Sequence, residues 1–431
     1  MAHAAEKTAI RVYNLVWGAA IPILRLSNRI SEGFDQRTMK KGLPSADLWI
    51  QAASGGEAYL AWAIIRYLSP TSPLKILMTS STRQGVEVLE KASLDARKNP
   101  AIDIATSYFP FDRPEMMKRA LAEVAPKLTV LLELELWPGL LAALKEKKCP
   151  TLIINGRITE KSLKKYMLWA DLWKYLRPDQ VIAISHEDAD RFRTLFQFDK
   201  VGVMPNIKFD ELEPSAENEK GMDTSPPLFS PKCPSVVLGS VRQEEEPFIK
   251  KIIIRLMKKK PDTVIGLIPR HMHRVMFWKN TLSMAGIPWI LRSGIKAPIQ
   301  QGTVILWDVF GELSMAYNHF RAAFVGGSLA PLGGQNFLEP LKYGVKPVIG
   351  PSWKNFSWVG EEIIKEGLVR IGQNWEEVAD IIMKDLSEPT DRDTIRQKVS
   401  GYIEKRKGGV NIACDMINAG LDNVREKTVE N

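Results

Sequence analysis

The sequence is poor in cysteine and has no repeat or low-complexity tract. Its three cysteines, Cys149, Cys233 and Cys414, lie far apart and lack the paired spacing of a zinc site or a disulfide framework. We therefore expect reduced thiols that fill the core of a protein in a reducing compartment. No known nucleic-acid-binding module is present, and the basic residues are interspersed with acidic ones, which argues against a nucleic-acid partner.

The N-terminal segment is apolar but too short to span a bilayer. Residues 9–26 read AIRVYNLVWGAAIPILRL, and Arg11 and Pro22 interrupt a run that falls short of the ~20 residues a transmembrane helix needs. The segment also lacks the cleavage site of a signal peptide. Trp17 within an apolar stretch that basic residues follow is typical of a helix lying in an anionic membrane surface, although a helix packed on the protein's own core fits the pattern equally well. We treat residues 1–40 as a membrane-associated segment.

Charge and composition are those of a basic globular protein. The 431 residues are 45% hydrophobic and 25% charged, and the length suits two or three domains. The net charge of +9 favours anionic partners such as phospholipid or phosphorylated substrates.

Short β-like runs alternate with helix-length segments along most of the chain. This alternation predicts parallel sheets with helices on both faces. A stretch rich in proline, serine and charge at 213–233 breaks the pattern and predicts a linker between an N-terminal domain (41–212) and a C-terminal domain (234–431). The predicted strands are 47–53, 75–79, 128–132, 151–155, 180–184, 235–238, 263–268, 288–291, 303–306, 322–325 and 346–349.

A glycine turn follows the first predicted strand. Ser54, Gly55 and Gly56 form the turn, and Glu57 opens the helix after it. A helix N-terminus favours the ionised form of such a carboxylate. The residue could serve a reaction as a base, or it could simply complement the helix dipole.

A longer glycine-rich loop follows a strand in the second half, in the stretch FVGGSLAPLGGQNFLEP at 324–340. We expect a helix from Gln335, with Glu339 in its first turn. Free backbone N–H groups at such a loop and helix start favour phosphate, and an acidic residue there is placed to accept hydrogen bonds from ribose hydroxyls. Two tight turns without a ligand are the alternative.

Two further carboxylates, Glu133 and Glu135, interrupt an apolar stretch. Strand alternation would place both on one face, where paired carboxylates are costly unless they serve a ligand or find partners. We expect them to position an acceptor, to support Glu57, or to form a structural salt bridge.

Together the motifs resemble one enzyme family, the 3-deoxy-D-manno-octulosonic acid (Kdo) transferases. The motifs SGGE (54–57), LELELWP (132–138), INGR (154–157), NIKFD (206–210), PRH (269–271), GEL (311–313) and FVGGSL…GGQNFLEP (324–340) occur in the order seen in that family. The resemblance implies a GT-B glycosyltransferase, in which two Rossmann-like domains face each other across a cleft. It also implies transfer of Kdo from CMP-Kdo to a lipid A precursor in lipopolysaccharide biosynthesis, at the cytoplasmic face of the bacterial inner membrane, without cofactor or metal.

The same resemblance assigns the site residues. Glu57 matches the family's catalytic glutamate and is expected to be the general base of an inverting transfer. Acceptor binding or support of the base falls to Ser54, Gly55, Gly56, Glu133 and Glu135. The expected nucleotide- and phosphate-binding residues are Lys208, Ser240, Arg270, His271, Gly311, Gly326, Gly327, Ser328, Asn336 and Glu339.

The chain also departs from the family pattern. Gln51 stands where the family usually has histidine, Gly55 replaces valine, and Pro205 replaces the glycine before NIKFD. Ser-Thr-His-Glu and Arg-Gly-Gly-His-Asn have become SVRQ (240–243) and LGGQN (332–336). A divergent paralogue with another sugar nucleotide or acceptor, or a catalytically silent nucleotide-binding membrane protein of this fold, is therefore the alternative.

Overall fold

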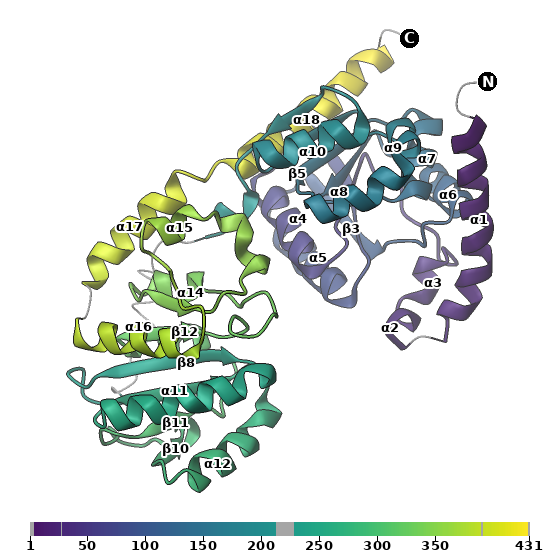
Figure 1. Cartoon of the computed structure of the whole chain (residues 1–431). Helices are drawn as coiled ribbons and strands as arrows, with labels where there is room; N and C mark the ends of the chain where they lie inside the picture. Colours follow the sequence, from purple (N-terminus) through teal and green to yellow (C-terminus); the bar gives the residue numbers. More distant parts are fainter. Residues whose placement is uncertain (1–3, 27, 213–227, 389–390, 430–431) are drawn as a thin grey trace. The chain divides into compact units, whose positions relative to one another are not determined.

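The computed structural model describes residues 4–26, 28–212, 228–388 and 391–429 (Figure 1). The chain forms two compact units. The first contains residues 1–211 and 406–431, and the second contains residues 212–405. Most of the predicted linker, 213–227, lies outside the described residues.

The first unit is built on a seven-stranded sheet in the order β3-β2-β1-β4-β5-β6-β7, in which every pair is parallel. Strand order reverses between β1 and β4, because β1 pairs with β2 on one side and with β4 on the other. The strands are β1 (Leu48–Gln51), β2 (Leu74–Ser80), β3 (Ile102–Tyr108), β4 (Leu128–Leu132), β5 (Thr151–Gly156), β6 (Gln180–Ala183) and β7 (Val201–Val203).

Helices cover both faces of this sheet, as the alternating pattern predicts. On β1, Leu48 and Ile50 pack into the core on one face, and Trp49 packs into the core on the other. Such two-sided burial is typical of a parallel sheet. The helices are α1 (Ala4–Leu24), α2 (Asn28–Ser31), α3 (Phe34–Arg37), α4 (Gly55–Tyr67), α5 (Arg83–Ala96), α6 (Pro114–Val124), α7 (Pro138–Lys147), α8 (Glu160–Tyr166), α9 (Ala170–Tyr175), α10 (His186–Phe196) and α18 (Gly409–Val429).

The second unit repeats the plan with a parallel sheet in the order β10-β11-β9-β8-β12-β13-β14. Here strand order reverses between β8 and β12. The strands are β8 (Ser235–Val241), β9 (Val264–Pro269), β10 (Trp289–Leu291), β11 (Val304–Leu306), β12 (Ala322–Val325), β13 (Pro347–Ile349) and β14 (Arg370–Ile371). The helices are α11 (Glu246–Lys259), α12 (Val275–Met284), α13 (Leu313–His319), α14 (Leu338–Lys342), α15 (Glu362–Lys365), α16 (Trp375–Ser387) and α17 (Arg392–Glu404).

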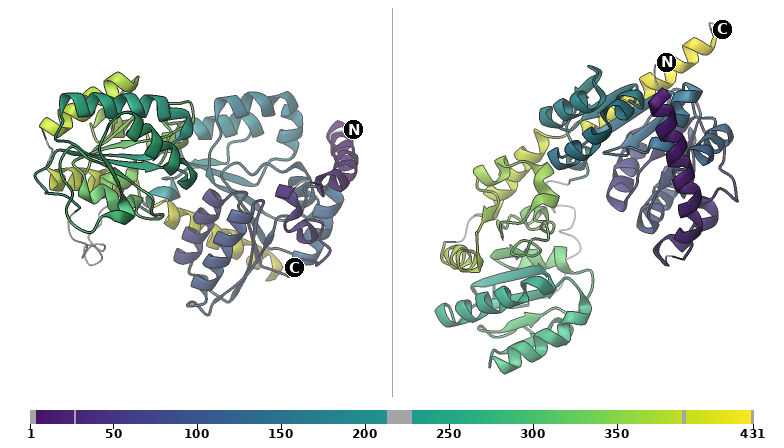
Figure 2. Two further views of the ribbon diagram at one scale, coloured as in Figure 1. Left: turned by 90° about the horizontal axis from the view of Figure 1, so that it is seen from below. Right: turned by 45° about the vertical axis from the view of Figure 1, so that its right-hand side comes forward.

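The last helix, α18, belongs to the first unit rather than the second (Figure 2). It packs against α4 and β4, and Ala413, Ile417 and Leu421 are buried in the same core as Leu128. The sequence assigned all of 234–431 to the C-terminal domain, whereas residues 406–431 belong to the first unit. Alternation of strands and helices shows where a helix lies along the chain, but not which sheet its apolar face covers.

The N-terminal helix α1 has one docked face and one exposed face. Trp17 stacks near Phe111 with ring centroids 5.7 Å apart, and the Tyr13 hydroxyl donates a hydrogen bond to Asp112 over 3.0 Å. On the other face, Leu15 and Ile23 expose 71% and 68% of their surface. The alternative of a helix packed on the protein's own core therefore holds for the docked face of α1. Among the described residues, no helix combines the length and apolarity needed to cross a membrane.

Candidate functional site

The predicted acidic residues of the first unit meet where its strand order reverses. Glu57 follows β1, while Glu133 and Glu135 follow β4, and these two parallel strands are neighbours. Open α/β sheets bind their ligands outside the carboxyl ends of the strands at this kind of switch point. Besides burial, the charge of Glu133 raises the pKa of Glu57, and the charges of Glu57 and Glu133 raise the pKa of Glu135, so the three carboxyl groups lie near one another.

Glu57 lies in the first turn of α4. Its Oε2 accepts a hydrogen bond from the Ser54 N–H over 3.0 Å, while Gly56 beside it is exposed. Burial and the charge of Glu133 raise the pKa of Glu57 above its usual value, and the backbone N–H groups of Ser54 and Ala53 oppose this rise. The sequence suggested that the helix start keeps Glu57 ionised. In the structure, desolvation of this carboxylate outweighs the effect of the helix start. A raised pKa brings the carboxylate closer to the range that suits a base near neutral pH.

Glu133 and Glu135 do not share a strand face, which corrects the expectation from alternation. Strand β4 ends at Leu132, and Glu133 takes a left-handed backbone conformation with φ 57°. Its Oε1 lies 2.6 Å from Nζ of Lys208, which the sequence assigned to the nucleotide. The buried Asn155 side chain positions this lysine, because its Oδ1 accepts the N–H of the preceding residue, Ile207, over 3.0 Å. The salt-bridge alternative is thus the arrangement observed for Glu133.

Glu135 is buried in a hydrogen-bonded chain of polar side chains. Its Oε2 accepts from Trp137 Nε1 over 2.6 Å and from Gln51 Nε2 over 3.1 Å. Gln51 in turn accepts the hydroxyl of Thr79 over 2.5 Å. Burial, followed by the charge of Glu57, raises the pKa of Glu135 to about 8. Gln51, one of the residues that depart from the family pattern, therefore contacts Glu135 directly.

In the second unit, an internal carboxylate occupies the glycine-rich loop. Glu245, fully buried, accepts the N–H groups of Ser328 over 2.8 Å and of Leu329 over 2.7 Å, and also that of Gly327. These N–H groups are therefore not free for phosphate, contrary to the sequence-based expectation. A buried anion in this position stabilises the loop much as a bound anion would. Sequence reasoning missed Glu245, because the run Glu244-Glu245-Glu246 looks like a solvated helix start.

The glycines of this loop serve its own packing. A Cβ on Gly326 would lie 2.5 Å from the Ser240 carbonyl oxygen, and Gly327 has φ 71°. Ser328 is buried, donates its hydroxyl to the Val325 carbonyl over 2.7 Å and accepts the N–H of Gly350. Gly326, Gly327 and Ser328 thus shape the loop. The N–H groups of Gly327 and Ser328 donate to Glu245 and not to a phosphate.

The remaining predicted donor residues lie at the carboxyl ends of the strands in the second unit. Glu339 is in the first turn of α14, which begins at Leu338 and not at Gln335, and its Oε1 accepts the Asn336 side-chain amide over 3.0 Å. Arg270 follows β9 and is exposed, and its charge opposes the burial-driven rise of the Glu339 pKa. His271 is exposed beside it, and Gly311 lies in the turn after β11 with φ 90° and open space beside it.

Comparison with known proteins agrees with the motif order. The family described as 3-deoxy-D-manno-octulosonic-acid transferase (kdotransferase) matches residues 26–211. The 3-deoxy-D-manno-octulosonic acid transferases of Haemophilus influenzae and Bordetella pertussis are 27% and 28% identical, each over 88% of this chain and 88% of the relative. Among solved structures, the C-terminal CMP-Kdo binding domain of WaaA from Acinetobacter baumannii is 30% identical over 39% of this chain and 88% of that one, with a TM-score of 0.36.

The fold has a known counterpart over almost the whole chain. UDP-GlcNAc 2-epimerase from Neisseria meningitidis superposes with a TM-score of 0.52 at 14% identity and covers 89% of this chain and 100% of that one. The two Rossmann-like sheets give the chain a GT-B fold. Its similarity to the Kdo transferases identifies a glycosyltransferase. The first unit matches the Kdo transferase family model, and most of the chain is similar to curated Kdo transferases.

Proposed function

We propose that this protein transfers Kdo from CMP-Kdo to a lipid A precursor in lipopolysaccharide biosynthesis, with Glu57 as general base. The observation that carries the proposal is the meeting of Glu57, Glu133 and Glu135 at the switch point of the first sheet. Similarity to the Kdo transferases supports the sugar and its donor. The acceptor follows from the same family argument and from the exposed apolar face of α1, which suits a lipid substrate.

The reaction needs one proton acceptor and one leaving group. An acceptor hydroxyl attacks the anomeric carbon of Kdo and forms the new C–O bond, while the bond from that carbon to the CMP phosphate oxygen breaks. Glu57 takes the hydroxyl proton, and CMP departs with the electron pair of the broken bond. Attack from the side opposite CMP gives inversion. The Ser54 N–H donates to the Glu57 carboxylate, and burial and the charge of Glu133 raise the pKa of that carboxylate.

The donor nucleotide is assigned to the second unit. Arg270 and His271 follow β9 and are exposed, so they are placed to stabilise the departing phosphate. Glu339 and Asn336 form a hydrogen-bonded pair suited to the ribose hydroxyls. Lys208 is paired with Glu133 in the first unit, and we assign it to tuning the base rather than to the nucleotide.

We place the protein at the cytoplasmic face of the bacterial inner membrane, as a peripheral protein. The support is the half-exposed helix α1 and the net charge of +9, which together suit an anionic lipid surface.

A single assay tests this proposal. The purified full chain is incubated with CMP-Kdo and tetra-acylated lipid A precursor, and the products are analysed by mass spectrometry. We expect a mass increase of one or more Kdo residues on the lipid, together with release of CMP. Transfer from another sugar nucleotide, but not from CMP-Kdo, would favour the divergent paralogue. Nucleotide binding without transfer from any donor would favour the catalytically silent protein.

Calorimetry tests the donor site separately. Glu339→Ala should weaken CMP binding by roughly 1–3 kcal/mol, because a buried hydroxyl loses its partner. Glu366→Ala, which removes an exposed carboxylate in the same unit, is the matched control. Equal CMP affinity in all three proteins would exclude Glu339 from the nucleotide site.

A further inference from the structure

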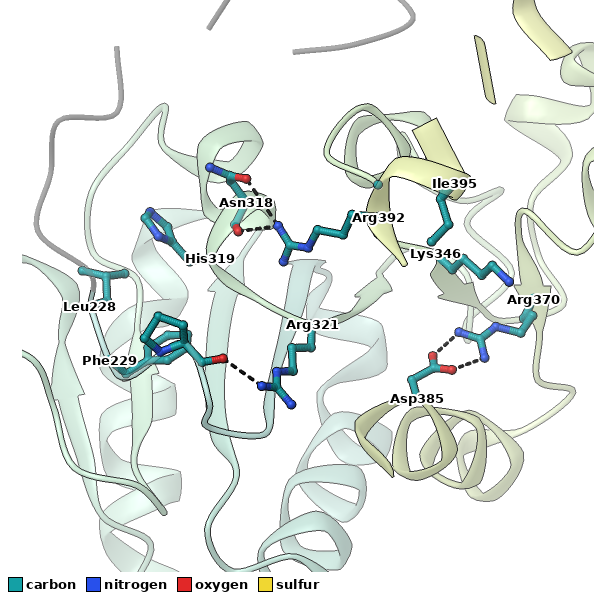
Figure 3. A pocket seen from close by; sticks show the side chains of 12 residues that line it. Leu228, Phe229, Asn318, His319, Arg321, Lys346, Arg370, Asp385, Arg392 and Ile395 are labelled. Carbon is teal, nitrogen blue, oxygen red and sulfur yellow. Dashed lines mark hydrogen bonds and ion pairs between the residues drawn. The ribbon is translucent and has the colours of Figure 1, made fainter. Parts of the chain in front are cut away.

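The second unit contains a cavity of about 450 Å³ that none of the predicted donor residues lines. Figure 3 shows its walls. Leu228 and Phe229 form an apolar part on one side, while Ile395 lies on the other side beside Lys346. The other part is strongly basic. A cavity of this size accommodates a small organic molecule.

The cavity lies at the amino ends of the strands, and the donor loops lie at their carboxyl ends. Arg321 directly precedes β12, Lys346 directly precedes β13, and Arg370 is the first residue of β14. The three strands run parallel, so these residues mark the amino ends of the strands, whereas the glycine-rich loop follows their carboxyl ends. The cavity is therefore separate from the proposed donor site.

Positive charge dominates the cavity. Four cationic side chains line it (Arg321, Lys346, Arg370 and Arg392) against one carboxylate, Asp385, which leaves a formal surplus of three positive charges. Asp385 forms a bidentate ion pair with Arg370, so its charge is already committed. Like charges held together in this way are costly unless an anion joins them.

Structural roles account for only part of this basic wall. Arg392 donates to the carbonyl oxygens of Asn318 and Phe320 at the end of α13, over 2.8 and 2.6 Å, and Arg321 donates through Nη2 to the Pro231 carbonyl over 2.8 Å. For Lys346, burial and the neighbouring charges of Arg370 and Lys398 lower its pKa, and Asp385 opposes this. In Figure 3, Lys346 lies on the same side of the cavity as the Arg370–Asp385 pair.

We propose that this cavity, lined by Arg321, Lys346, Arg370 and Arg392, is a second binding site, and that it takes a phosphorylated organic molecule. The phosphate would lie against the four cations, because Arg and Lys are the side chains that bind phosphate oxygens best. The organic part would lie against Leu228 and Phe229. A soluble phosphate ester and a lipid headgroup share this chemistry, so the experiment compares both sources.

The experiment titrates the full chain with inorganic pyrophosphate by calorimetry. Four proteins are compared: the wild type, Lys346→Gln in the cavity, Arg270→Gln at the donor loop, and Lys258→Gln on an exposed surface of the same unit as the matched control. We expect binding to weaken about tenfold or more in Lys346→Gln, because a charge-assisted hydrogen bond is lost, and to stay unchanged in Lys258→Gln. Pyrophosphate should also protect Lys346, but not Lys258, from acetylation detected by mass spectrometry.

Two outcomes overturn the proposal. One is equal pyrophosphate affinity in the wild type and Lys346→Gln. The other is binding that Arg270→Gln weakens while Lys346 stays unprotected, which would place the anion at the donor loop. Flotation with phosphatidylglycerol vesicles separates the sources: a lipid headgroup requires Lys346→Gln to reduce vesicle binding relative to Lys258→Gln, and a soluble ligand requires the two variants to float equally.

Discussion

Nζ of Lys208 lies 2.6 Å from Oε1 of Glu133, and Glu133 in turn raises the pKa of Glu57. The lysine therefore acts on the proposed base through an intermediate carboxylate. Its motif match suggested a contact with the donor phosphate, and the two roles predict different kinetics.

We expect Lys208→Met to shift the acid limb of the pH–rate profile to higher pH. Without the lysine, Glu133 carries an uncompensated charge, which raises the pKa of Glu57 further, so the base loses its proton only at higher pH. Lys91→Met removes an exposed lysine of the same unit and is the control. A fall in CMP affinity with an unchanged pH profile would instead assign Lys208 to the donor phosphate.

Replacing the base itself should abolish most of the activity. Glu57→Gln keeps an oxygen for the Ser54 N–H but cannot accept a proton at neutral pH, so transfer should fall by ~10²–10⁴-fold with CMP affinity unchanged. The matched control is Glu377→Gln, because Glu377 accepts the Gln373 N–H over 2.9 Å in the first turn of α16. Near wild-type transfer by Glu57→Gln would reduce Glu57 to a helix-capping residue and make Glu135 the next candidate.

Burial of Glu135 makes stability depend on pH. Its pKa is raised from 4.5 to about 8 in the folded protein, so folding takes up a proton between these values. The free energy of unfolding should therefore fall as pH rises through this window. In Glu135→Gln the fall should be smaller by about 1 kcal/mol or more between about pH 5.5 and about pH 8.5, measured by urea unfolding. Asp112, whose pKa burial raises to about 7, contributes with the same sign in both proteins. Identical pH dependence in the two proteins would contradict this account.

The buried carboxylate of Glu245 should be essential to the second unit. Glu245→Gln presents an amide group to N–H donors, so we expect a loss of roughly 3 kcal/mol or more in the free energy of unfolding. Glu244→Gln, at the exposed neighbouring position, should change little. Chemical unfolding of both variants provides the measurement, and equal midpoints would show that Glu245 does not support the loop.

Membrane association should depend on the exposed face of α1. The double variant Leu15→Gln with Ile23→Gln should bind anionic vesicles more weakly than the wild type, while its unfolding midpoint stays unchanged because neither side chain is buried. High salt should weaken wild-type binding without abolishing it, since apolar burial is not screened. Leu94→Gln, at a leucine that is 56% exposed on α5, is the control. Equal pelleting by all three proteins would exclude α1 as the anchor.

Local patterns predicted most of the sheet framework, including β4 and β12 to the residue, because both strands are short and fully buried, and Thr129 is their one polar residue. They missed β3, where Asp103 is exposed and the middle of the strand is only partly buried, and also β7 and β14, which have three and two residues. Edge strands like these lack the two-sided burial that marks an inner strand.

At the candidate site, residue types were predicted better than their partners. Glu57 was placed near its helix start because the signal is local, but α4 begins at Gly55, so the two glycines predicted as a turn are its first residues. The pairing of Glu133 with Lys208 spans 75 positions and that of Glu245 with Ser328 spans 83, so no local pattern contains them. The left-handed backbone conformation of Glu133 after β4 could not be predicted either, because glutamate rarely adopts it.

The return of α18 to the first unit has a consequence for how the protein is made. The surface formed by α4 and β4 is translated early, but the helix that covers it follows all of the second unit. During synthesis this apolar surface near Leu128 stays uncovered until the ribosome has passed Leu421, so the first unit completes its core after the second has been translated. Chain order and folding order therefore differ, and a nascent chain halted before Gly409 would present an apolar face to chaperones.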